Sequence, residues 1–77
     1  MDPQLAKSYS LLGLVYNKRA ELEAQKCYSF STIISTLELA EENLQKAVEL
    51  DPSLMATVRS DLESILQKKE MYKRRMD

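Results

Sequence analysis

The sequence predicts an all-α domain in which two helices form an antiparallel hairpin and a third helix follows. Apolar residues recur at spacings of three and four, which is the period of an amphipathic helix. The chain is 44% hydrophobic and 30% charged, with one Gly and two Pro. Each Pro follows an Asp, and an Asp-Pro pair favours a helix start. We expect helices at about 3–28, 31–50 and 53–75, in a single domain of residues 1–77.

The first helix is predicted to begin at Pro3, with Asp2 accepting hydrogen bonds from free backbone N–H groups. One set of its residues falls on a single face, which we expect to pack in the core. That set is Leu5, Tyr9, Leu12, Tyr16, Ala20, Ala24 and Cys27. A second set widens the apolar surface, so this helix is predicted to contact more than one neighbour. The second set is Leu11, Leu14, Val15 and Leu22.

The turn between the first two helices contains neither Gly nor Pro. Ser and Thr side chains in segment 27–32 compete for backbone hydrogen bonds, and Ser29 or Ser31 can cap a new helix. We therefore expect the turn at Tyr28–Ser31. Because residues 17–26 are mostly good helix formers, one continuous helix from Pro3 to Leu50 is the alternative.

The second helix is predicted to end at Asp51-Pro52, since Pro disfavours helical geometry in the residue before it. Its expected core face consists of Phe30, Ile33, Leu37, Ala40, Leu44 and Ala47. The third helix carries a row at alternating spacings of four and three, which is typical of a helix packed along another helix. That row is Val58, Leu62, Ile65, Lys69, Tyr72 and Met76.

One pattern resembles a tetratricopeptide repeat. It consists of Tyr9, Leu12, Gly13 and Tyr16, then Ala40, Leu44 and Ala47, then Asp51-Pro52. The resemblance implies that the small residues Gly13, Ala40 and Ala47 let two helices approach closely. It also implies a hairpin in residues 1–52 and a capping helix in residues 53–77.

The match departs from a standard repeat in its length. Between Tyr16 and Ala40 lie about 15 residues more than an uninterrupted repeat of roughly 34 residues would have. An insertion of that size predicts about two additional turns in each helix. The second interpretation is a three-helix domain similar to microtubule-interacting and transport domains, which have a similar length and bind partners in a helical groove.

Charges are nearly balanced, with 11 basic and 12 acidic residues and a net charge of -1. This balance argues against nucleic-acid binding as the main function. The distribution is uneven: residues 27–51 contain five acidic residues and one basic residue, and residues 52–77 contain four acidic and six basic residues. We expect the acidic middle and the basic end to attract each other.

Several function classes lack the residues they need. The chain has no His and a single Cys, Cys27, which excludes an internal disulfide and zinc sites that use His. It also lacks a Gly-rich phosphate loop and an activated-nucleophile motif, so we expect no enzyme activity and no cofactor. There is no apolar run of about 18 residues for a membrane span. We expect an intracellular, cytoplasmic protein.

We therefore predict a protein–protein interaction module that binds a partner peptide or helix through a helical groove. The alternative is a self-associating structural element, a helical homodimer in which the apolar surplus of the first helix and the row of the third helix pair with another copy. Exchange of hairpins between the two copies is a special form of this alternative. The candidate partner-binding residues are Leu11, Leu14, Val15 and Leu22, with Tyr28 and Phe30 at the hairpin tip. A second candidate surface is the basic end, which consists of Lys68, Lys69, Lys73, Arg74 and Arg75.

Overall fold

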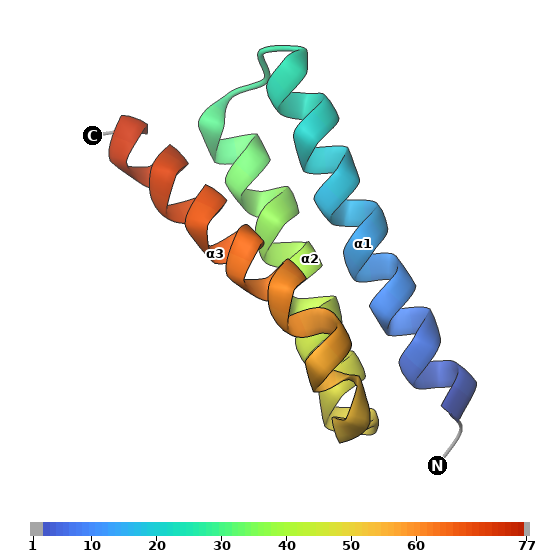
Figure 1. Cartoon of the computed structure of the whole chain (residues 1–77). Helices are drawn as coiled ribbons and strands as arrows, with labels where there is room; N and C mark the ends of the chain where they lie inside the picture. Colours follow the sequence, from blue (N-terminus) through green and yellow to red (C-terminus); the bar gives the residue numbers. More distant parts are fainter. Residues whose placement is uncertain (1–2, 77) are drawn as a thin grey trace.

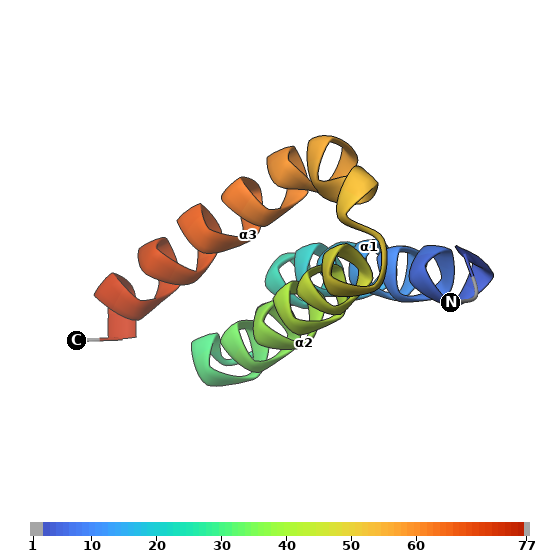
Figure 2. The same ribbon diagram turned by 90° about the horizontal axis from the view of Figure 1, so that it is seen from below.

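The computed structural model describes residues 3–76, which form three α-helices in two layers (Figure 1). Helix α1 (Pro3–Gln25) and helix α2 (Phe30–Leu50) form an antiparallel hairpin. A 3-10 turn, η1 (Pro52–Leu54), leads into α3 (Met55–Met76), which runs back over α2 (Figure 2). The molecule is elongated, with principal extents of 42 × 18 × 14 Å. The predicted all-α hairpin with a third helix is confirmed.

Small residues bring α1 and α2 into close contact. Ala6, Gly13 and Ala20 are buried and recur every seven residues along α1. A Cβ atom on Gly13 would lie 2.5 Å from Leu44 Cγ and 3.1 Å from the Ala40 carbonyl oxygen. Since this is well inside van der Waals contact, the helices can approach this closely only because residue 13 has no side chain. The predicted role of Gly13 is confirmed.

Two leucines that we expected in the core lie at the edge of the α1–α2 contact. Leu5 is 46% exposed and Leu12 is 44% exposed, so the prediction that both are buried is wrong. The reason is the row of small residues, which sits directly against α2 and leaves the larger side chains beside it. Asp2, the predicted cap of α1, lies outside the described residues.

The core is built mainly from α2, which packs against α1 on one side and α3 on another. The predicted face of α2 is confirmed, since its buried residues include Ile33, Leu37, Ala40, Leu44 and Ala47. The predicted row of α3 faces the same core: Val58 and Ile65 are buried, and Leu62 and Tyr72 pack against them. The side chain of Met76 lies outside the described residues.

The turn between α1 and α2 is a Schellman motif centred on Cys27. The Tyr28 N–H donates to the Glu23 carbonyl at 3.0 Å, and the Cys27 N–H donates to the Ala24 carbonyl at 3.2 Å. Cys27 has φ of 61°, the left-handed conformation that this motif requires. The chain therefore turns here, and α1 ends at Gln25, three residues before the predicted end.

Ser29 starts the second helix, as one of the two predicted caps. Its side chain accepts a hydrogen bond from the Thr32 N–H at 3.3 Å, and its backbone is extended, with φ of -60° and ψ of 147°. Ser31, the other candidate, lies inside the helix. The side chain of Asp51 repeats this arrangement at η1, where it accepts from the Ser53 N–H at 3.1 Å.

Replacing Cys27 with Gly is expected to raise the free energy of unfolding by about 0.5–1 kcal/mol. A residue other than Gly in the left-handed conformation costs roughly 1–2 kcal/mol, and Gly would relieve this strain. Part of the gain is lost, because Gly makes the unfolded chain more flexible. Urea denaturation would measure the difference. Cys27→Ala is the matched control, because Ala keeps the backbone strain. Equal changes in the free energy of unfolding for the two substitutions would show that the left-handed backbone at residue 27 is not strained.

Candidate functional site

A hollow lies between α1 and α3, because α3 packs chiefly against α2 and has few contacts with α1. We call this hollow of about 250 Å³ the α1–α3 groove. Its floor is apolar and comes from α2, whereas its rims come from α1 and α3. It is lined by Ala20, Glu21, Ala24, Gln25, Ile33, Leu37, Lys68, Met71 and Tyr72.

Lys68 bridges the groove from α3 to α1. Its Nζ atom donates hydrogen bonds to Asn17 Oδ1 at 3.2 Å and to Glu21 Oε1 at 3.3 Å. The hydrogen bond and positive charge of Lys68 hold the pKa of the Glu21 carboxyl below its ordinary value, with a smaller contribution from Lys18. A polar group beside an apolar floor suits a peptide-binding groove, because the Lys68 ammonium group can also donate a hydrogen bond to a backbone carbonyl of the peptide.

Replacing Lys68 with Met is expected to lower the free energy of unfolding at neutral pH by about 0.2–1 kcal/mol, the range of exposed ion pairs. Because the folded-state pKa of Glu21 is depressed, the pair stabilises the fold above the unfolded-state pKa, and its contribution disappears as pH falls through the folded-state value. Denaturation of both proteins at neutral pH and below about pH 3 would measure this. A difference that persists in acid would contradict the assignment.

A ring contact and an ion pair hold the far half of α3 on α2. The rings of Phe30 and Tyr72 lie 5.5 Å apart, and Lys69 Nζ lies 3.4 Å from Glu41 Oε1. The Lys69 and Glu41 side chains are only 13% and 19% exposed, so removing either charge would leave the other largely buried without a partner. The expected attraction between the acidic middle and the basic end is confirmed at this contact.

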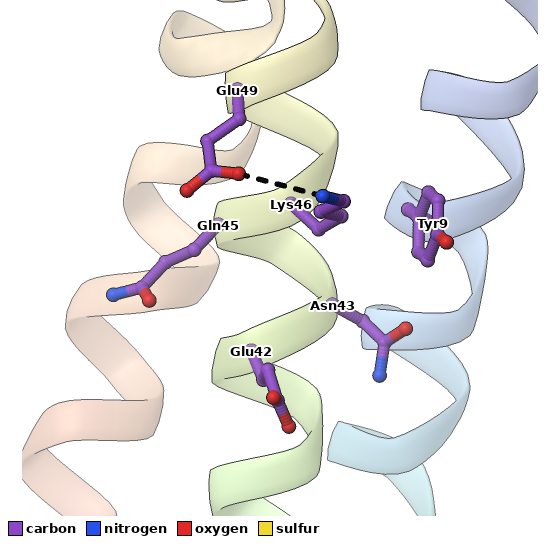
Figure 3. Close-up of a pocket in the computed structure, with 6 residues that line it drawn as sticks. All are labelled: Tyr9, Glu42, Asn43, Gln45, Lys46 and Glu49. Carbon is purple, nitrogen blue, oxygen red and sulfur yellow. Dashed lines mark ion pairs between the residues drawn. The ribbon is translucent and has the colours of Figure 1, made fainter.

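A larger hollow of about 450 Å³ lies along α1 and α2. Its lining is mostly polar and consists of Tyr9, Glu42, Asn43, Gln45, Lys46 and Glu49. Figure 3 shows that these side chains do not converge on one point: Glu49 pairs with Lys46 at 3.8 Å, and Glu42 points away from Tyr9. We therefore do not assign a reaction to this hollow.

The predicted partner-binding residues divide into two groups in the structure. Leu11, Leu14, Val15, Leu22 and Tyr28 are all exposed, by 42–63%. Phe30 was expected to be exposed at the hairpin tip, but it is half-buried against Tyr72. The reason is that α3 is long enough to cover the start of α2. Their role in binding stays a prediction.

The basic end is also divided. Lys68 and Lys69 are half-buried and bound in the ion pairs described above. Lys73, Arg74 and Arg75 lie in the last turn of α3 and are exposed, where cations stabilise the negative end of the helix dipole. Arg74 also lies 3.8 Å from Glu70. Of these five residues, only Lys73, Arg74 and Arg75 therefore present an open basic surface.

Sequence reasoning missed two features of this region. Met71 and Ala24 line the α1–α3 groove from opposite sides. Predicting this would require the position of α3 relative to α1, which the spacing of residues does not give. Glu23 is 6% exposed, with Oε2 3.5 Å from Arg19 and Oε1 lacking a hydrogen-bond partner among the described residues. The spacing of four between Arg19 and Glu23 is a signal for the ion pair, although not for its burial.

Two kinds of functional feature are absent from residues 3–76. No group of three or more His, Cys, Asp or Glu residues is placed to hold a metal ion. No helix there is sufficiently long and apolar to cross a membrane. Comparisons of the chain with protein-family models, curated proteins and solved structures gave no match. The geometry described above is therefore the basis for inferring function.

Proposed function

We propose that this chain is a protein–protein interaction module that holds a partner helix or extended peptide in the α1–α3 groove. The observation that carries this proposal is the apolar lining of the groove, where Met71 is exposed and Ala24 and Tyr72 are half-buried beside the buried Ile33 and Leu37. A side chain of a partner that fills this groove would remove apolar surface from water. Lys68 and Gln25 at the rims would supply polar contacts to its backbone.

The resemblance to a stretched tetratricopeptide repeat supports this proposal. Gly13, Ala40 and Ala47 are buried in the hairpin, as the pattern implies. The two hairpin helices are 23 and 21 residues long, which fits an insertion divided between them. In this interpretation α3 is the capping helix of the hairpin, and the groove between α1 and α3 is the binding surface.

A substitution that fills the groove would test the proposal. Peptides would be selected from a displayed random library on the wild-type chain, and their affinities measured by calorimetry. Ala24→Leu places a larger side chain in the groove and is expected to weaken binding by at least about tenfold. Ala56→Leu is the matched control, since Ala56 is exposed on α3 outside the groove. Equal affinities of the two variants, or no selected peptide, would contradict the proposal.

Self-association is the second candidate, and the exposed leucines of α1 favour it. The row of α3 is not available for pairing with another copy, because it packs against α2 in the same chain. Hairpin exchange would require segment 26–29 to become helical. Replacing Ser29 and Ser31 with Ala should favour that open form. If the double variant keeps the molar mass of the wild type in sedimentation, the exchange hypothesis fails.

A further inference from the structure

A row of apolar and basic side chains runs along the side of α1 that faces away from α2. It consists of Lys7, Leu11, Val15, Lys18 and Leu22 on the helix and Lys26 directly after its end, at spacings of four, four, three, four and four. Residues at these spacings are neighbours on a helix surface. The opposite side of α1 bears the buried Ala6, Gly13 and Ala20. We call this set the α1 outer row.

The apolar members of the α1 outer row are among the most exposed in the molecule. Leu11 is 63% exposed, Val15 53% and Leu22 48%. A spacing of four, then seven, aligns them as one stripe instead of scattering them over the surface. Single exposed apolar residues are common on proteins, but an aligned stripe on one helix is a feature of helices that pair with another helix.

The charges within the row are all positive. Lys7, Lys18 and Lys26 lie within the row, and Arg19 lies one turn after Val15. The two acidic residues of α1 flank the row and are already paired: Glu21 with Lys18 and Lys68, and Glu23 with Arg19. Within residues 3–26, the outer side of α1 therefore offers apolar contact and positive charge.

We propose that the α1 outer row binds an amphipathic helix of a partner protein whose apolar stripe is flanked by Asp and Glu. This goes beyond the proposed function, because the α1 outer row is separate from the α1–α3 groove. The stripe would be covered by the leucines or isoleucines of the partner, and its carboxylates would meet the lysines. The row extends over 19 residue steps from Lys7 to Lys26, or about 28 Å, so a helix of about 20 residues matches it.

Charge argues against a second copy as the occupant. Pairing two α1 outer rows would place lysines of one copy against lysines of the other, which opposes association. Helix α2 of a second copy has an acidic outer side with Glu38, Glu42 and Glu49, but Leu39 is the only large apolar residue exposed on that helix within the described chain. It would supply charge without covering the stripe.

The position of Lys18 argues for a helix over a membrane surface. Lys18 lies in the middle of the stripe, between Val15 and Leu22, and its side chain is 76% exposed. Immersion of the stripe in a bilayer would carry this ammonium toward the acyl chains, whereas a partner helix can place a carboxylate beside it.

Two designed peptides of about 20 residues would test the proposal. Both carry the same leucine stripe, flanked by Glu in the acidic peptide and by Lys in the basic peptide. The expected result is that the acidic peptide binds the full chain at least about tenfold more tightly than the basic peptide, by calorimetry at low salt. Equal binding of the two peptides, or binding of neither, would overturn the proposal.

Variants of the chain would locate the binding surface. Two double variants should each weaken binding of the acidic peptide by at least about tenfold: Leu11→Ser with Leu22→Ser, and Lys7→Glu with Lys26→Glu. The lysine double variant should also strengthen binding of the basic peptide. Leu66→Ser and Lys73→Glu are the matched controls, since both residues are exposed on α3, and neither should change binding. Circular dichroism would verify that each variant is folded.

Three further results would assign the α1 outer row, or the peptide, to a different interaction. If Ala24→Leu abolishes binding and the row variants do not, the peptide lies in the α1–α3 groove, and this inference fails while the proposed function stands. If vesicles of phosphatidylglycerol bind the chain through the row more tightly than the acidic peptide does, a membrane surface replaces the helix. A wild-type dimer that Leu11→Ser with Leu22→Ser converts to a monomer would assign the row to a second copy. Each of these results overturns the proposal.

Discussion

Leu37→Ala is expected to lower the free energy of unfolding by about 2–5 kcal/mol, the range for a buried Leu truncated in a core. Leu37 is fully buried, and it lies in the cluster that joins all three helices, with Ala20 of α1 and Ile65 of α3. A single core of this size supplies roughly 3–5 kcal/mol. We therefore expect this variant to be largely unfolded at room temperature.

Leu39→Ala is the matched control for this prediction. It removes the same atoms from the same helix, two residues away, but Leu39 is 43% exposed. Its cost should stay near or below about 1 kcal/mol, because less apolar surface returns to water. Thermal and urea denaturation followed by circular dichroism would measure both. Similar losses for the two variants would show that the side of α2 that faces the core has been assigned wrongly.

Gly13→Ala is expected to lower the free energy of unfolding by up to about 2 kcal/mol, although Ala is the better helix former. Helix propensity favours Ala by about 1 kcal/mol, but overpacking a tight contact costs roughly 1–3 kcal/mol. The added Cβ would meet Leu44 Cγ and Cδ2 at 2.5 and 2.6 Å. It would also meet the Ala40 carbonyl oxygen at 3.1 Å, and this backbone atom cannot rotate away.

A double-mutant cycle would show whether this clash is the cause. Leu44→Ala removes the atoms that the new Cβ would meet, at the cost of a cavity. In that background Gly13→Ala should cost less than in the wild type, so that the two losses are not additive. A stabilising effect of Gly13→Ala in the wild type would contradict the close approach of α1 and α2 at this position.

Much of the fold was predictable because local signals were strong. Asp51-Pro52 marks a boundary that proline chemistry enforces, and the structure has the end of α2 there. The spacing of apolar residues in α2 and α3 gave the buried faces, since one side of each helix is clearly polar. Gly13 was also identified correctly, because an isolated Gly within a helical pattern often has a packing reason.

The end of α1 and the tip of the hairpin were harder to predict. Cys27 adopts the left-handed conformation that usually belongs to Gly, so no composition signal marked the end of the helix. Phe30 was placed at an exposed tip because the path of α3 was unknown, and Tyr72 covers it. Tertiary contact decided the environment of both residues.

The candidate site was predictable only in part. The exposed leucines of α1 could be identified as surplus apolar surface, since a single hairpin has too few neighbours to bury them. Leu5 and Leu12 were assigned to the core, because spacing alone does not say which of two adjacent apolar rows faces α2. The α1–α3 groove depends on the angle at which α3 leaves α2, which no sequence pattern here encodes.

Sedimentation equilibrium over a wide concentration range tests the central claim most directly. The claim is that the hairpin and α3 close within one chain and leave the α1 surface for a foreign partner. It predicts a folded monomer of 8.9 kDa up to high concentration, with constant helix content. A tight dimer at low concentration would contradict it, because a second copy would already cover the surface that we assign to a partner.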